Sequence, residues 1–269
     1  MNVVEVLSEK LGAEVREVSV TKNNGIELTG VSVKMPNSNL AAVIYKGEDD
    51  QPEEFVNKVL SKMDVIKEAP MSNKPFELSK EYILNNVYPA LVNTSLNKEM
   101  LEKRWVNKKF KDLSIIYKID VDMGTTTVVR EIMDAFDISI TELTKAAMNN
   151  LDPTIIDMAD FAAKYSQSEG TPRGMMYIVS NENHVYGAGS ITSKGICQTL
   201  YELLGEFFII PASVHEVLCV GKPEHISVED QITALKAMVY DTNRSEVDPS
   251  EFLSDSLYHF DGKNITVVE

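Results

Sequence analysis

The chain has little cysteine, little tryptophan and no long hydrophobic run. Its 269 residues include two cysteines and one tryptophan. Two cysteines without a close pairing motif do not make a disulfide framework, so we expect small core residues in a reducing compartment. No stretch approaches the ~20 apolar residues of a membrane-spanning helix, and the first residues lack the basic and apolar regions of a signal peptide. We therefore expect a soluble cytoplasmic protein that does not enter a membrane.

Basic residues are scarce as well. Lys and Arg number 26 against 41 Asp and Glu, so the net charge is −15 at pH 7. Sequence-independent binding of nucleic acid is disfavoured, because phosphate contacts need a surplus of Lys and Arg. Acidic residues gather at 48–54 and again from Glu224 onward. We expect this charge to keep the molecules apart in solution. The alternative is an acidic surface that imitates nucleic acid in a partner's basic groove, with Asp49, Asp50 and Glu53 as candidate contacts.

Hydrophobic residues make up 43% of the chain and charged residues 25%, which is the globular range and excludes general disorder. Residues 1–70 predict a helix, three strands and a helix. The first helix stops at Gly12, and the turn Asn23-Asn24-Gly25 joins the first two strands. The apolar parity of the second strand flips at Gly30, which predicts a β-bulge. The third strand spans 40–45, and the second helix follows Pro52.

Two prolines within 69–75 mark the best candidate for a domain boundary. Beyond it, 76–269 predicts a larger mixed domain. We expect a partly helical segment at 82–101, a half-buried strand at 113–121, helices starting at Ser139 and at Asp152, strand–strand–helix–strand at 174–220, a helix from Ser227 and a C-terminal hairpin near 257–268. The predicted fold class is α+β, an N-terminal αβββα unit plus a larger mixed α/β domain.

Ser213, His215 and Glu216 form the only tight group of nucleophile, base and carboxylate. If 207–220 is one strand, Ser213 and His215 share a face and Glu216 points the other way. A catalytic triad needs its base between nucleophile and acid, and no Gly-x-Ser-x-Gly elbow exposes this serine. We favour a structural role for the three residues. The alternative is a hydrolase that uses His215 with Ser213 or Glu216.

Other chemical motifs are incomplete. The segment 215–219 has Cys where a zinc-binding helix needs its second His, and Asp120 with Asp122 lacks a third ligand. The run 187–190 reads Gly-Ala-Gly-Ser, without the Lys of a phosphate-binding loop or the third glycine of a dinucleotide site. It predicts a tight turn or close backbone packing. We expect no metal and no cofactor.

One basic patch contrasts with the acidic chain. Trp105 and Phe110 are surrounded by Lys98, Lys103, Arg104, Lys108, Lys109 and Lys111. Basic side chains between aromatic rings can hold a single nucleic-acid strand. We favour a helix in which Trp105 anchors to the core while the lysines stay in water. Trp105 is retained as a candidate anchor for a protein partner.

Several stretches resemble an uncharacterised domain-of-unknown-function family, encountered mainly in Gram-positive anaerobic bacteria of the gut. They are LSEKLGAEVREVSVTKNNGIELTGVSV, YPALVNTSLNKEML with FKDLSIIYKIDVD, GMMYIVSNENHVYGAGSI and IIPASVHEVLCV. The most specific motifs are Leu-Val-Asn at 91–93 and Ile-Pro-x-Ser-x-His-Glu-Val at 210–217. The resemblance spans nearly the whole chain and implies a soluble bacterial protein, often carried on mobile elements. It implies no reaction, cofactor or catalytic residue.

Since every catalytic pattern fails in spacing or membership, we expect a non-catalytic protein that acts through a protein partner. One version is a mobile-element regulator or inhibitor whose acidic face blocks a nucleic-acid-handling enzyme. The hydrolase with His215 is the competing class. A small-ligand sensor near Gly187 and Gly189 is a third.

Overall fold

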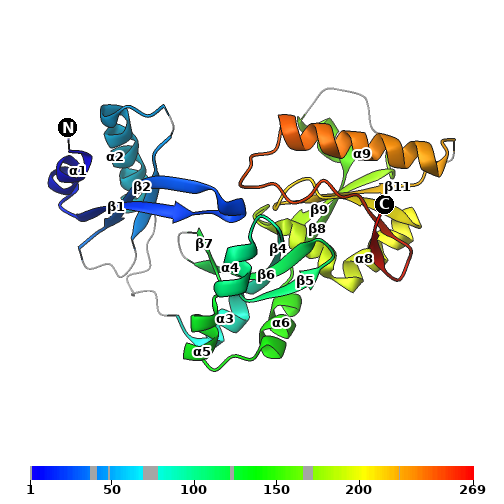
Figure 1. Ribbon diagram of the computed structural model, residues 1–269, viewed down its shortest axis with the longest axis horizontal. Helices are drawn as coiled ribbons and strands as arrows, with labels where there is room; N and C mark the ends of the chain where they lie inside the picture. Colours follow the sequence, from blue (N-terminus) through cyan, green and yellow to red (C-terminus); the bar gives the residue numbers. More distant parts are fainter. Residues whose placement is uncertain are drawn as a thin grey trace. The chain divides into compact units, whose positions relative to one another are not determined.

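The chain folds into two units, and both combine helices with antiparallel sheets (Figure 1). The computed structural model describes residues 2–36, 41–47, 49–68, 78–121, 124–165, 172–223 and 225–269. Unit 1 is Met1–Leu78 and unit 2 is Ser79–Glu269. This arrangement confirms the predicted α+β class. The predicted break at 69–75, Asp122, Glu48 and Glu224 lie outside the described residues.

Unit 1 is a three-stranded sheet covered by two helices. Its elements are α1 (Val3–Leu11), β1 (Glu14–Thr21), η1 (Asn23–Gly25), β2 (Glu27–Lys34), β3 (Ala42–Tyr45) and α2 (Pro52–Glu68). The strands pair in the order β1-β2-β3, and Leu7, Val33, Val59 and Met63 belong to one core between sheet and helices. The predicted stop at Gly12 is confirmed, because Gly12 is left-handed at φ 58°. The predicted turn is confirmed by φ 60° at Asn24.

The bulge predicted at Gly30 is wrong. The β1–β2 register runs without interruption from Glu14 opposite Lys34 to Thr21 opposite Glu27. Gly30 answers a steric requirement instead, since a Cβ on it would lie 2.2 Å from the carbonyl oxygen of Ile44 on β3. The glycine allows close contact between neighbouring strands.

Unit 2 contains two antiparallel sheets. Its first half comprises α3 (Lys80–Asn86), β4 (Val87–Asn93), α4 (Lys98–Lys103), β5 (Asn107–Phe110), β6 (Leu113–Val121), β7 (Gly124–Thr127), α5 (Arg130–Ala135) and α6 (Ile140–Asn149). Its second half comprises β8 (Pro153–Asp157), α7 (Met158–Tyr165), β9 (Met176–Asn181), η2 (Gly187–Thr192), α8 (Lys194–Leu204), β10 (Phe207–Ile210), β11 (Val217–Gly221), α9 (Val228–Ser245), β12 (Tyr258–Phe260) and β13 (Ile265–Val267). One sheet has the order β4-β6-β5 with β7 on β6, and the other β13-β12-β10-β11-β9-β8.

Helices cover both faces of the six-stranded sheet (Figure 1). On one face, Phe208 and Val220 pack with Leu235 and Val239 of α9. On the other, Phe207 contacts Phe260 with ring centroids 5.2 Å apart. Successive strand residues point to opposite faces, so the continuous apolar run of β10 supplies both cores. The C-terminal hairpin predicted near 257–268 is confirmed as β12 and β13.

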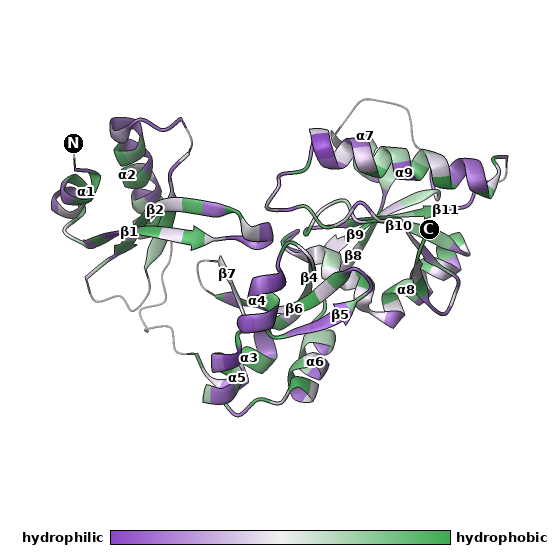
Figure 2. Ribbon diagram, in the orientation of Figure 1, coloured by the Kyte–Doolittle hydropathy of each residue, from purple (hydrophilic) through white to green (hydrophobic). Residues whose placement is uncertain are grey.

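The smaller sheet is built around β6. Its residues from Leu113 to Ile119 are all buried, so the strand predicted as half-buried is covered on both faces. The hydroxyls of Tyr117 on β6 and Thr144 on α6 lie 2.7 Å apart. The predicted helix start at Ser139 is confirmed, because its Oγ accepts a hydrogen bond from Glu142 N at 3.2 Å. Figure 2 shows hydrophilic β5 beside the hydrophobic β6.

Four sequence predictions for unit 2 need correction. The second strand expected within 174–220 is the 3-10 helix η2. The segment 82–101 contains the strand β4 between two short helices, and Pro89 is tolerated because β4 is a sheet edge. Asp152-Pro153 starts the strand β8, since Thr154, Ile155 and Ile156 favour extended backbone. The segment 207–220 is two strands, β10 and β11, joined by a loop at 211–216. Among the described residues, no helix is long and apolar enough to cross a membrane.

Candidate functional site

The loop that joins β10 to β11 carries Ser213, His215 and Glu216, so the single-strand geometry predicted for them does not apply. In this loop, Ser213 N donates to the carbonyl of Glu216 at 3.1 Å. The Oγ of Ser213 accepts a hydrogen bond from His215 N at 3.0 Å. The serine hydroxyl therefore stabilises a tight turn.

The imidazole of His215 bridges two other segments. Its Nδ1 accepts a hydrogen bond from the backbone N of Tyr186 at 3.2 Å, and its Nε2 lies 3.2 Å from Oε1 of Glu251. Since Nδ1 is an acceptor, the ring proton of neutral His215 resides on Nε2 and points to Glu251. The rings of Tyr186 and His215 also pack with centroids 5.7 Å apart. Both ring nitrogens thus fix the geometry of neighbouring segments.

The same loop supports the segment 186–192. The carbonyl of His215 accepts the hydroxyl of Ser180 at 2.8 Å, and the carbonyl of Val214 accepts Ala188 N at 3.3 Å. Tyr186, with φ 55°, enters η2 in a left-handed conformation that is uncommon for an aromatic residue. Lys118 Nζ lies 4.0 Å from the centre of the Tyr186 ring, which is a cation–π contact.

The glycine run at 187–190 is confirmed as close backbone packing. Gly187, Gly189 and Ser190 are buried. A Cβ on Gly189 would lie 2.0 Å from the carbonyl oxygen of Pro89 on β4. A Cβ on Gly187 would lie 2.4 Å from Asn181 N on β9. The run therefore packs its backbone closely against both sheets of unit 2.

The two motifs of the family resemblance have related roles. Asn93 ends β4, and its Nδ2 donates to the carbonyl of Leu253 at 2.7 Å. Its Oδ1 accepts from Leu96 N at 2.9 Å. Asn93 and His215 thus both bind the segment at 251–253, one from each sheet. Glu251 could not be found from sequence, because neither spacing nor a motif connects it with His215.

Trp105 is buried, with 8% of its surface exposed, and packs with Val92, Leu101 and Ile116 in the core of the smaller sheet. Its burial favours the core interpretation over the partner-binding one. The structure also changes the predicted single basic helix. Lys98 and Lys103 lie on α4, Lys108 and Lys109 on β5, and Lys111 in the following turn.

The acidic candidates of unit 1 differ in their surroundings. Asp50 accepts hydrogen bonds from Gly47 N at 2.7 Å and from Lys58 Nζ at 2.8 Å. The hydrogen bond from Lys58 lowers the pKa of Asp50, and that from Gly47 N adds to it. Asp49 and Glu53 are exposed, and neither makes an ion pair within the described part of unit 1. Asp50 is consequently a turn residue, whereas the exposed side chains of Asp49 and Glu53 can contact a partner.

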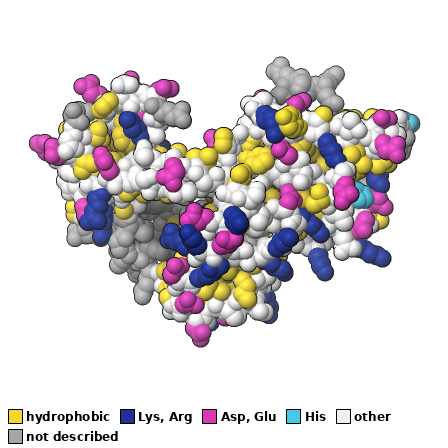
Figure 3. Space-filling view, in the orientation of Figure 1, with side chains coloured by type: hydrophobic (Ala, Val, Ile, Leu, Met, Phe, Trp, Pro, Cys, Tyr) yellow, Lys and Arg dark blue, Asp and Glu magenta, His cyan; other side chains and the backbone are white. Residues whose placement is uncertain are grey.

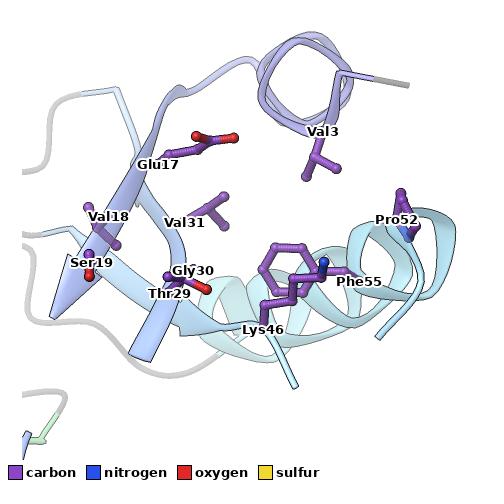
Figure 4. Close-up of a pocket in the computed structure, with 10 residues that line it drawn as sticks. All are labelled: Val3, Glu17, Val18, Ser19, Thr29, Gly30, Val31, Lys46, Pro52 and Phe55. Carbon is purple, nitrogen blue, oxygen red and sulfur yellow. The ribbon is translucent and has the colours of Figure 1, made fainter. Parts of the chain in front are cut away.

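Unit 1 also contains a cavity of about 390 Å³. Figure 4 shows Val3 of α1, Val31 of β2 and Phe55 of α2 around a common space, with Glu17 and Lys46 near its edge. One carboxylate and one amine give this cavity no preference for a charge sign.

A second cavity, of about 410 Å³, lies in unit 2 between the β5–β6 turn, the first turn of α8 and the β12–β13 hairpin. Four lysines line it, namely Lys109, Lys111, Lys194 and Lys263. The sequence patch included Lys109 and Lys111. It missed Lys194 and Lys263, since only the fold brings their segments to this place. Figure 3 shows Lys and Arg side chains gathered on this face of unit 2, over α4, β5 and α8.

Carboxylates, thiols and imidazoles do not assemble into a metal centre in the described residues, where no group of three could hold an ion. Asp120 instead accepts the hydroxyl of Tyr88 at 2.9 Å.

Comparison with known proteins identifies a family but no characterised relative. A model described as a family of unknown function, DUF5688, matches residues 1–262. No curated protein and no solved structure matches the chain.

Proposed function

Because the chain belongs to the DUF5688 family, whose function is unknown, we propose from its own residues that it is a non-catalytic protein acting through a protein partner. We place it in the cytoplasm of a Gram-positive anaerobic bacterium, as a regulator or inhibitor carried on a mobile element. Its acidic side chains would occupy the basic groove of a nucleic-acid-handling enzyme. The partner, rather than a substrate, is then the molecule to identify.

The observation that carries this proposal is the set of contacts made by the imidazole ring of His215. Both of its ring nitrogens are engaged, one by Tyr186 N and the other by Glu251. A general base needs a nitrogen free to take a proton from the nucleophile. The best catalytic candidate in the sequence is therefore occupied in holding loops together. A net charge of −15 and the exposed Asp49 and Glu53 supply the surface for a basic partner.

The test is a tagged pull-down from the native bacterium after nuclease treatment, with washes at low and high salt. Wild type is compared with the double variant Asp49→Lys/Glu53→Lys and with Glu9→Lys, which reverses an exposed charge on α1 of the same unit. We expect one stoichiometric partner that the double variant loses and Glu9→Lys keeps. Binding should weaken at high salt, because exposed charges are screened.

Two results count against the proposal. If no partner is recovered, or if the double variant binds as wild type does, the acidic surface around Asp49 is not the contact. A complex that survives high salt would eliminate nucleic-acid mimicry while keeping the protein partner.

The hydrolase alternative rests on one specific observation, the 3.2 Å approach of Glu251 to His215, which resembles the acid–base pair of a triad. Against it stands the Oγ of Ser213, which accepts the backbone N of His215. Hydrolysis of a simple ester by wild type, abolished by Ser213→Ala with the fold intact, would favour the alternative. We expect equal and negligible rates for both proteins.

A further inference from the structure

The cavity of unit 2 has walls from three distant segments. Lys109 and Lys111 come from the β5–β6 turn, Lys194 from the first turn of α8, and Lys263 from the β12–β13 hairpin. All four side chains are exposed. The fold therefore concentrates four positive charges around one hollow in a chain whose net charge is −15.

None of these four lysines forms an ion pair within the described residues. Other amines of the chain do find carboxylates, as Lys58 does with Asp50 at 2.8 Å. Four like charges around one cavity repel one another. An anion bound among them would offset this repulsion and gain charge-assisted hydrogen bonds from the amines.

Two carboxylates belong to the same turns, but both accept hydrogen bonds from hydroxyl or backbone N–H groups and form no ion pair with the four lysines. Asp112 accepts hydrogen bonds from the hydroxyls of Ser254 at 2.6 Å and Tyr258 at 2.7 Å. Asp261 accepts the backbone N of Lys263 at 2.8 Å and of Asn264 at 2.7 Å. These backbone hydrogen bonds lower the pKa of Asp261 and keep its carboxylate in the turn. Neither residue lines the cavity.

The rest of the wall is mixed: Thr192, Gln198 and Asn264 are polar, and two aromatic rings give it an apolar part. Phe110 is half-buried, and Phe260 is buried and packs edge-on against Tyr201 with centroids 6.1 Å apart. Cys197 also lines the cavity, but its Sγ is buried and 3.2 Å from the carbonyl oxygen of Ile191. Burial raises the pKa of this thiol to about 11, so it is a neutral group of the wall.

We propose that this lysine cavity binds a small molecule that carries two or more phosphate groups and an apolar or aromatic body. A volume of about 410 Å³ falls in the range of small-molecule sites. Phosphates suit lysines, which act as point charges toward several oxygens, and a ring can lie against Phe110 and Phe260. The first turn of α8 adds a favourable field, since a helix N-terminus attracts negative charge.

This site shares no residue with the acidic surface of unit 1, so it is tested independently of the partner proposal. The probe is ADP, titrated into the full-length protein by calorimetry, with adenosine and inorganic phosphate as the two partial ligands. Two variants, Lys194→Gln and Lys263→Gln, remove one charge each from different segments. Lys108→Gln is the matched control, because Lys108 is an exposed lysine of the same strand as Lys109 but does not line the cavity.

We expect ADP to bind and adenosine to bind at least tenfold more weakly. Each cavity variant should weaken ADP by about tenfold, which corresponds to one lost charged contact. Lys108→Gln should leave the affinity unchanged, and ADP should raise the melting temperature of wild type. Unchanged melting temperatures of the free variants would show that folding is unaffected.

Three outcomes overturn the proposal. The first is no heat and no thermal shift with millimolar ADP. The second is equal weakening by Lys108→Gln, which would place the anion on the general basic surface. The third is a single-stranded oligonucleotide that binds far more tightly than ADP and is affected by Lys108→Gln, which would make the patch a nucleic-acid surface. If inorganic phosphate binds as tightly as ADP, the site recognises phosphate alone, and the ligand needs no apolar body.

Discussion

The carboxylate of Asp112 accepts a hydrogen bond from the hydroxyl of Tyr258 at 2.7 Å, although 146 residues separate the two. Asp112 also accepts the hydroxyls of Ser254 and Ser256. One carboxylate in the β5–β6 turn thus gathers three hydroxyls from the segment that enters β12. Both the β5–β6 turn and the β12–β13 hairpin contribute lysines to the cavity. Asp112 therefore fixes the positions of two cavity walls relative to each other.

Asp112→Ala should lower the free energy of unfolding by about 2 kcal/mol, since hydrogen bonds to a charged group are lost and the buried Tyr258 hydroxyl is left without its acceptor. Urea denaturation measures this change. Asp134→Ala is the control, because that exposed carboxylate on α5 makes no hydrogen bond within the described residues. Equal stability of the two variants would contradict a structural role for Asp112.

Gly189→Ala should destabilise unit 2 by about 3 kcal/mol or more, because the added Cβ would lie 2.0 Å from a backbone oxygen that cannot rotate away. Gly195→Ala, six positions further on in α8, is the matched control. Its Cβ would have a nearest neighbour at 3.7 Å, and alanine in a helix is about 0.5–1 kcal/mol better than glycine. Melting curves of the two variants should move in opposite directions, and a neutral Gly189→Ala would refute the close packing.

Both cysteines should resist a thiol reagent at pH 8. Cys197 and Cys219 are 4% and 0% exposed, and burial raises the pKa of both. The reactive thiolate is therefore scarce as well as inaccessible. A colorimetric disulfide reagent should titrate both thiols in guanidinium chloride and neither in the native protein within minutes. Rapid reaction of one native thiol would show that its surroundings open.

Acid should weaken the contact between α9 and the segment before β12. Arg244 donates to both carboxylate oxygens of Asp255 at 3.1 Å, and these hydrogen bonds lower the pKa of Asp255. A depressed folded-state pKa gives stability above the ordinary aspartate pKa of about 3.9, and this stability is lost as the pH falls through the lower folded value. Both side chains are nearly half exposed, so screening limits the effect to about 1 kcal/mol.

The measurement is the stability difference between wild type and Asp255→Asn at several pH values. The difference should be largest at pH 7 and vanish in strong acid. In an Arg244→Gln background, Asp255→Asn should change stability little at any pH. A difference that persists below pH 2 would assign the effect to something other than this ion pair.

Elements with local signals could be predicted from the sequence. The helix stop at Gly12, the cap at Ser139 and the hairpin turn at Asn24 follow from backbone conformations that few residues accept. Predictions failed where apolar periodicity was ambiguous. The segment from Thr154 to Ile156 suits a strand or a helix by pattern, and pairing with β9 decides for the strand.

The sites show the same limit more strongly. Crowding around Gly189 was foreseeable, because adjacent small residues indicate close backbone approach. Neither the Glu251 partner of His215 nor the meeting of Lys194 with Lys111 was foreseeable, since both are contacts between distant segments. A single sequence contains no spacing rule for such contacts.

The links from the smaller sheet to the segment at 253–258 span 160 residues at Asn93 and 146 at Asp112. Such contacts close long loops, so the chain loses conformational entropy before packing stabilises it. Topologies rich in these contacts fold in milliseconds to seconds. Unit 2 should therefore complete its fold late and as a whole. The lysine cavity, made from three of these distant segments, would then exist only in molecules that have finished folding.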